Sequence, residues 1–195
     1  MLRARDIDCA YIASAFFSDF LAQMEYRAPD FKIDEDMEGK RVFLLGGYEE
    51  DSSQLCQLRR ALNLRGVEAH AYRLPTPEKG EIRLQWHAKI AVFLCDTKPV
   101  LAIVGSSNFS GSTMYGGTEH KPMPPSNFIQ VEADSFYWLK SHMNTAQAVH
   151  DAFHYWGGGR SAPHIAFDNE KFDEEIEELI ESIYSRVLSF NWQKL

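Results

Sequence analysis

Cysteine is scarce in this chain of 195 residues. Cys9, Cys56 and Cys95 are the three present, and their number is odd. They are widely separated, and no C-x-x-C pair or Cys/His spacing typical of a zinc site occurs. The sequence therefore predicts neither a disulfide framework nor a metal site. We expect free, buried thiols in a reducing compartment, which points to the cytoplasm.

Long hydrophobic runs are also lacking. No stretch is long enough to span a membrane. The apolar segment near the N-terminus is short and contains Ser14, and the basic residues Arg3 and Arg5 are followed at once by Asp6 and Asp8. This pattern does not fit a signal peptide. We expect no contact with a membrane.

Basic residues are fewer than acidic ones, with 20 Lys and Arg against 28 Asp and Glu, which gives a net charge of −8. This balance argues against indiscriminate coating of nucleic acid, but it leaves room for a local basic cleft. The length and a hydrophobic content of 45% suit one globular domain. We expect one main domain over residues 1–160. An amphipathic helix within 161–195 would pack on that domain or at a dimer interface.

Residues 85–110 form the most informative stretch, QWHAKIAVFLCDTKPVLAIVGSSNFS. Two apolar runs, 90–95 and 100–104, predict buried strands joined by a turn. His87 and Lys89 are two positions apart at the start of the first strand, so their side chains share a face. In a hairpin, the start of the first strand lies beside the end of the second.

That pairing would gather an imidazole, an ammonium, hydroxyls and an amide at one place. Such groups can hold an anionic phosphoryl group and attack it. The residues concerned are His87, Lys89, Ser106, Ser107 and Asn108.

H-A-K at the start of one apolar run and G-S-S-N at the end of the next resemble the H-x-K…G-S-x-N signature of the phospholipase D superfamily, the HKD motif. The resemblance covers residues 7 to about 155. The family's aspartate, five residues after the lysine, is Leu94 here, and Asp96 is displaced by two. The family's later N-x-E is Gln130-Val131-Glu132. Nuclease-like members also lack the aspartate, so its loss speaks more against lipases than against nucleases.

The resemblance implies covalent catalysis through a phosphohistidine. One His87 attacks the phosphorus, and a second His87 protonates the leaving oxygen and later activates water. Lys89 and Asn108 stabilise the charge of the transition state, so no metal or other cofactor is implied. Hydrogen bonds to the substrate or to His87 are implied for Ser106, Ser107 and Glu132.

No internal repeat is found, so each chain carries one H-x-K motif. The resemblance to small members of the superfamily implies a homodimer that builds one active site on its two-fold axis. The expected function is a nuclease that cleaves DNA rather than RNA, as part of a restriction or defence system in which a partner supplies recognition or motor activity. A phospholipase D-type lipid hydrolase or transferase, and a non-catalytic dimeric scaffold of the same fold, remain alternatives.

Trp86 lies directly beside the motif, and the sequence leaves two interpretations of it open. Its ring could stack on a base of the substrate, or it could belong to the hydrophobic core. The spacing of His150 and His154, four apart on an expected helix, is one that a metal pair can have. No third ligand accompanies them, so a surface or packing role is preferred.

The rest of the chain predicts an α/β fold, a mixed sheet with helices on both faces. For residues 7–17 a strand is preferred to a helix because the superfamily begins with a strand. Residues 51–53 offer a helix N-cap. The polar insertion 110–126 is expected to border the site. Strands are expected at 7–17, 41–45, 67–74 and 127–133, and helices at 20–24, 53–64, 134–155 and 167–190.

Overall fold

The structure is a computed structural model of the chain, and it describes residues 1–15, 17–18, 37–47, 52–75, 86–106, 109–110, 134–156 and 173–195. Seven strands form one mixed sheet in the order β8-β6-β5-β1-β3-β4-β9. The first strand, β1 at Cys9–Ser14, pairs in parallel with β3 and antiparallel to β5, so it lies inside the sheet. The strand interpretation of residues 7–17 is therefore confirmed over the helix.

A βαβ unit follows, made of β3 (Arg41–Gly46), α2 (Ser53–Asn63) and β4 (Glu68–Arg73). The two strands are parallel, as the sequence predicts. Leu55 and Leu58 of α2 are buried against them. One detail differs, because Ser52 occupies the N-cap position without a side-chain capping hydrogen bond.

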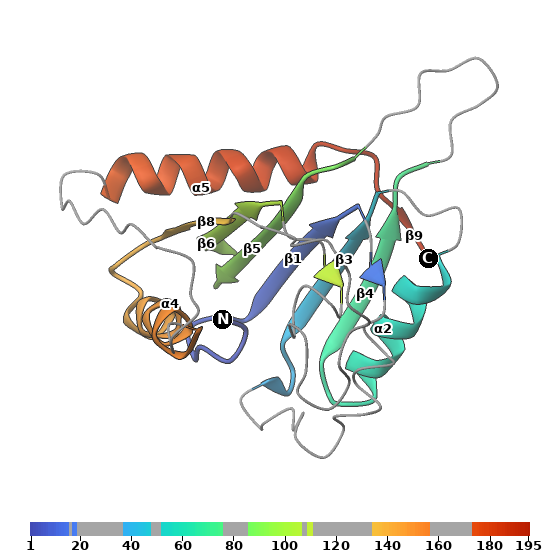
Figure 1. Cartoon of the computed structure of the whole chain (residues 1–195), viewed down its shortest axis with the longest axis horizontal. Coiled ribbons are helices and arrows are strands. Elements are labelled where there is room, and N and C mark those ends of the chain that lie inside the picture. The colour runs from blue at the N-terminus through green and yellow to red at the C-terminus, as the bar shows by residue number, and fades with distance from the viewer. Residues whose placement is uncertain are drawn as a thin grey trace, which may run out of the picture.

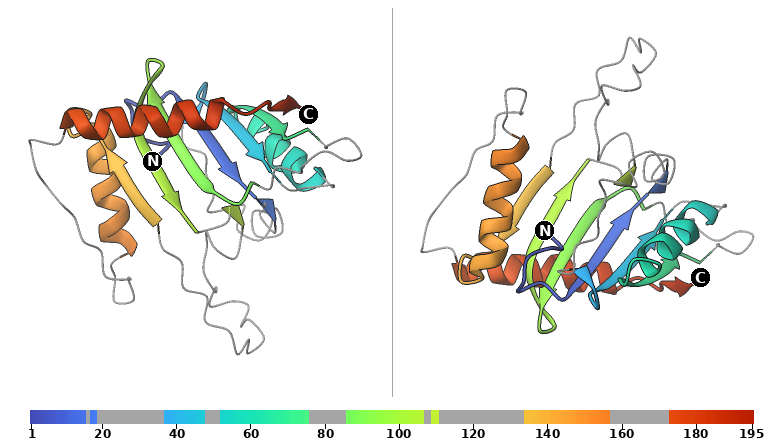
Figure 2. Two further views of the ribbon diagram at one scale, coloured as in Figure 1. Left: turned by 90° about the horizontal axis from the view of Figure 1, so that it is seen from above. Right: turned by 90° about the horizontal axis from the view of Figure 1, so that it is seen from below.

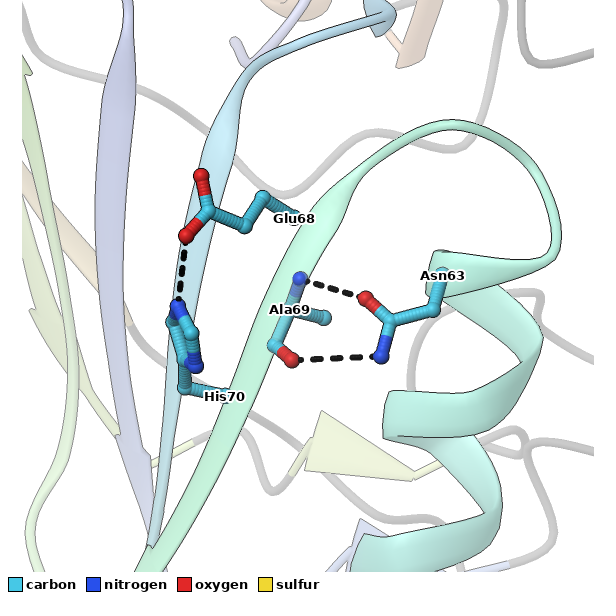
Figure 3. A network of polar contacts seen from close by, with 4 residues as sticks. All are labelled: Asn63, Glu68, Ala69 and His70. Carbon is cyan, nitrogen blue, oxygen red and sulfur yellow. Dashed lines mark hydrogen bonds and ion pairs between the residues drawn. The ribbon is translucent and has the colours of Figure 1, made fainter.

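The outer edge of β4 is partly covered by side-chain contacts (Figure 3). The short strand β9 (Gln193–Lys194) pairs with Tyr72 and Arg73 near the end of β4. Closer to its start, the side-chain amide of Asn63 accepts a hydrogen bond from Ala69 N at 2.7 Å and donates one to Ala69 O at 3.3 Å. These bonds satisfy backbone groups that an edge strand would otherwise leave open.

The predicted central hairpin is present. Strand β5 (Lys89–Cys95) pairs antiparallel with β6 (Lys98–Gly105). The connection is the two residues Asp96 and Thr97, and both have positive φ, 47° and 74°. Positive φ at both positions is the geometry of a type I′ turn, whose twist matches that of the flanking strands.

A Thr97→Gly variant is expected to be more stable than the wild type. The left-handed region costs an L-residue about 1–2 kcal/mol, and a β-branched side chain is among the least tolerant of it. We expect thermal unfolding to shift upward by several degrees, corresponding to about 1 kcal/mol. Asp96→Gly is the matched control and should gain less, because Asp tolerates this conformation. A lower melting temperature for Thr97→Gly would contradict the turn geometry.

The segment after the insertion differs from its prediction. Residues 134–138 were expected to begin a helix, but Asp134–Trp138 is strand β8, paired antiparallel with β6. The aromatic residues 136–138 favour a strand, and the pairing with β6 outweighs the N-cap signal of Asp134 and Ser135.

The helix itself, α4, begins later and runs over Met143–Trp156. Its first turn is capped by a residue distant in the sequence. The Asp6 carboxylate accepts hydrogen bonds from Thr145 N at 3.1 Å and from Thr145 Oγ1 at 2.8 Å. Thr145 is fully buried, so these bonds tie the N-terminal segment to α4.

The predicted C-terminal helix is α5, at Asp173–Leu188. Its apolar stripe packs on β5, β6 and β8 of the same chain, with Ile180 and Val187 buried, whereas Leu179 is 39% exposed. In the described part of the chain, no helix combines the length and the apolarity needed to cross a membrane.

The helices lie on both faces of the sheet, with α5 on one side and α2 and α4 on the other (Figure 1). Figure 2 shows α5 crossing the strands on its own side. The expected α/β architecture with a mixed sheet between helices is thus present. Three expectations fall outside the described residues: the helix at 20–24, the strand at 127–133 and the insertion beyond Ser110.

Candidate active site

The start of β5 lies beside the end of β6. Lys89 pairs with Gly105, so Ser106, the next residue, leaves the sheet at the same edge. On the other side, Ala13 of β1 pairs with Ile90. The carboxyl ends of β1 and β6 therefore meet the beginning of β5, as the hairpin argument predicts.

His87 and Lys89 are in direct contact at this edge. Lys89 Nζ lies 3.2 Å from His87 Nδ1. The His87 side chain is exposed, whereas Lys89 is 7% exposed. An accessible imidazole next to a largely buried ammonium is a suitable arrangement for attack on a phosphoryl group whose negative charge the ammonium stabilises.

The contact between these two residues bears on the tautomer of His87. A charged ammonium can only donate, so Nδ1 of His87 accepts, and a neutral imidazole then carries its ring proton on Nε2. This form cannot attack through Nε2, and a general acid needs the imidazolium, which is protonated on both nitrogens. A nucleophilic His87 needs the other tautomer, with Nε2 free of its proton.

Ser14 is a residue of this edge that the sequence analysis did not single out. It ends β1, one position after Ala13, and so reaches the sheet position beside Lys89. Ser14 is 1% exposed, so its hydroxyl is buried on the strand next to the start of β5. The feature of the sequence that could have identified Ser14 is its place near the end of the first expected strand.

The chain on both sides of Asn108 is anchored at this edge. Strand β7 (Phe109–Ser110) pairs in parallel with β2 (Phe17–Ser18), which follows β1. Ser106 is exposed at the end of β6. The remaining predicted site residues lie outside the described residues, and their positions stay predictions: Ser107, Asn108 and Glu132. The described chain resumes at Asp134, which pairs with Gly105.

Trp86 lies on the opposite side of the strand from His87 and is 6% exposed. Its ring contacts Phe190 and Trp192 edge-on, with centroids 5.0 Å and 5.5 Å away. Its Cβ packs so closely on Gly47 that a Cβ at that glycine would lie 2.4 Å from it. These contacts correspond to the core interpretation, and they give no support to the prediction that Trp86 binds substrate.

Neither Leu94, which stands at the position of the family's aspartate, nor the displaced Asp96 brings a carboxylate near the H-x-K residues. Leu94 is 3% exposed, in the core. Asp96 lies in the hairpin turn, at the far end of β5 from Lys89. Seven residues of strand separate the two ends by roughly 20 Å. The site thus lacks this aspartate, as the sequence comparison with the motif indicates.

The thiols do not offer an alternative nucleophile. Burial raises the pKa of Cys9 to about 11, and it also raises the pKa of Cys95. The three cysteines are free, as expected, although only Cys9 is fully buried. Within the described ranges, no group of three or more His, Cys, Asp or Glu side chains is arranged to hold a metal ion.

A row of acidic side chains lies on the face of the sheet opposite α2. Helix α5 lies on the face of the sheet opposite α2 and carries a row of exposed glutamates: Glu174, Glu175, Glu177, Glu178 and Glu181. Lys89 lies on the face of the sheet that α2 covers. Ala91, two positions further along β5, projects to the same face as Lys89 and pairs with Ile12 of β1. Ile12 packs in the hydrophobic cluster that contains Leu55 and Leu58 of α2. An acidic protein can therefore present a cationic site.

Three solved structures are similar to this chain at a low level. NucT from Helicobacter pylori aligns with a TM-score of 0.36 and 11% identity, over 80% of each chain. Polyphosphate kinase from Porphyromonas gingivalis aligns with a TM-score of 0.36 and 16% identity, over 96% of this chain and 28% of its own. Yeast tyrosyl-DNA phosphodiesterase aligns with a TM-score of 0.30 and 15% identity, over 57% of this chain and 25% of its own.

This chain thus spans about a quarter of the length of the latter two proteins. No protein-family model and no curated protein matches the sequence. At these TM-scores the likeness carries no argument about function.

Proposed function

We propose that this protein is a metal-independent phosphodiesterase, and most specifically a nuclease that cleaves DNA. The observation that supports it is the contact of 3.2 Å between exposed His87 and buried Lys89, at the edge where β6 ends in Gly105 and Ser106. The motif residues that the structure describes support the proposal, because His87 contacts Lys89 and Ser106 follows the residue that pairs with Lys89.

In the proposed reaction, Nε2 of His87 attacks the phosphorus while the bond from phosphorus to the leaving oxygen breaks. The leaving oxygen takes a proton from Nε2 of a second His87, supplied by a second copy of the chain. That second histidine then removes a proton from water, which attacks the phosphohistidine and releases His87. Lys89, with Asn108, stabilises the negative charge on the non-bridging oxygens.

The two histidines need different protonation states. The His87 that acts as the acid is an imidazolium, protonated on both ring nitrogens, and it becomes a neutral imidazole when Nε2 gives its proton to the leaving oxygen. A His87 whose Nδ1 donates to a carboxylate has Nε2 free and is the nucleophile. Glu132 is the proposed carboxylate. A homodimer with one shared site accommodates both forms.

The test is cleavage of DNA, RNA and phosphatidylcholine by the full-length protein in excess EDTA. Products from DNA that survive chelation would support the proposal. Activity on phosphatidylcholine alone would favour the lipid hydrolase. No activity on any diester would favour the non-catalytic scaffold, and activity abolished by EDTA would contradict the metal-independent mechanism. A partner protein that supplies recognition is proposed as well.

A further inference from the structure

Arg73, the last residue of β4, is half-buried yet has no ion-pair partner within the described residues. Other half-buried arginines are engaged. Arg41 pairs with Asp8 at 3.6 Å, and Arg59 donates to the backbone oxygen of Leu195. Arginine is rarely withdrawn from water without a partner. Since no carboxylate of the described residues pairs with this half-buried guanidinium, it can take an anionic ligand.

The register of the sheet places Arg73 on the same face and at the same edge as the site. Arg73 pairs with Gly46, Gly46 pairs with Ser14, and Ser14 reaches the position beside Lys89. Residues that pair across strands project to the same side. Three inter-strand spacings separate Arg73 from Lys89, about 14 Å between Cα atoms.

The chain that carries His87 runs between these two cations. Trp86 packs on Gly47, the residue after β3, and Lys89 begins β5 on the other side of β1. Residues 86–89 therefore cross the carboxyl end of β1. His87 thus lies between the ends of β3 and β5, on the path from Lys89 towards Arg73.

We propose that Arg73 binds a second phosphate of a polynucleotide whose scissile phosphate lies at His87. This inference rests on the proposed function and narrows its substrate class, because a short diester that reaches His87 and Lys89 would not extend to Arg73. The guanidinium fork suits bidentate contact with a phosphate. The bound strand therefore leaves the site towards β4.

The experiment compares two substrates, bis(4-nitrophenyl) phosphate and a fluorescein-labelled single-stranded oligodeoxynucleotide. The variants are Arg73→Ala, Arg73→Lys and Arg60→Ala, the last an exposed arginine on α2 as matched control. For Arg73→Ala, the ratio of kcat/KM on the oligonucleotide to kcat/KM on the small diester should fall about tenfold, the loss expected for a charged hydrogen bond. The slope of log binding constant against log salt should fall by about 0.7.

Arg73→Lys should keep the wild-type salt slope because it keeps the charge, but it should recover only part of the ratio because it loses the bidentate fork. Arg60→Ala should leave both values at those of the wild type. An unchanged ratio and salt slope in Arg73→Ala, or an equal fall in Arg60→Ala, would overturn the inference. If the wild type cleaves the small diester but neither binds nor cleaves the oligonucleotide, the inference fails while phosphodiesterase activity stands. If the wild type cleaves neither substrate, the proposed function fails as well.

Discussion

His87→Ala is expected to reduce diester cleavage by about 10³-fold or more, because the substitution removes both the nucleophile and the general acid from a shared site. The His87 side chain is exposed, so its loss should leave the melting temperature close to that of the wild type. Activity is measured in excess EDTA on bis(4-nitrophenyl) phosphate and on DNA. His150→Ala is the matched control, since His150 is exposed on α4, away from this edge.

A second measurement addresses the covalent intermediate. An alkaline quench of the wild type during turnover of a labelled diester should retain label on the protein, and subsequent acid should release it, as expected for a phosphohistidine. His87→Ala should retain none. Substantial activity in His87→Ala, or label that remains attached in the variant, would rule out His87 as the nucleophile.

Lys89→Met is expected to reduce kcat/KM by about 10²–10³-fold, the loss seen when one group that stabilises transition-state charge is removed. The same substitution should not lower the melting temperature. Lys89 is 7% exposed, so the folded state carries the cost of withdrawing an ammonium from water, and methionine of similar shape avoids that cost. Loss of activity without loss of stability separates a functional lysine from a structural one.

The matched control is Lys98→Met, because Lys98 is exposed at the other end of the hairpin. It should keep wild-type activity. If Lys89→Met unfolded the protein, the contact with His87 would be holding the sheet together. If the variant stayed folded with full activity, the ammonium would have no part in the chemistry.

Much of this edge could be predicted from the sequence, because strand ends and alternation are local properties. The apolar runs and the turn residues between them are sufficient to place the start of β5 beside the end of β6. The register that pairs Lys89 with Gly105 also depends on an irregularity between Phe93 and Leu94, which the sequence does not reveal. The same alternation places Trp86 on the face opposite His87, which is why its ring meets Phe190 rather than the site. The sequence analysis left Trp86 open because the partners on its face come from the far C-terminus.

Other features could not be predicted because they depend on contacts between distant segments. Strand β8 replaced an expected helix start, since pairing with β6 outweighs the local preference of Asp134. The cap of α4 comes from Asp6, 139 residues before Thr145, whereas the local cap expected at Ser52 does not form. Ser14 and Arg73 were identified as residues of this edge only from the pairing of the strands in the structure, which aligns residues of four different strands in one row.

The position of β1 has a consequence for how the site is assembled during folding. Neighbouring segments of the chain form two halves of the sheet, β3-α2-β4 on one side and β5-β6-β8 on the other, and β1 pairs with both. Its pairing with β5 closes a long loop, from Cys9 to Leu94, and such contacts form late. That pairing is required to bring Ser14 beside Lys89, and also to align Lys89 in one row with Arg73 across the sheet. A chain with two folded halves but no inserted β1 therefore lacks the complete row of site residues, so completion of folding and assembly of the site coincide.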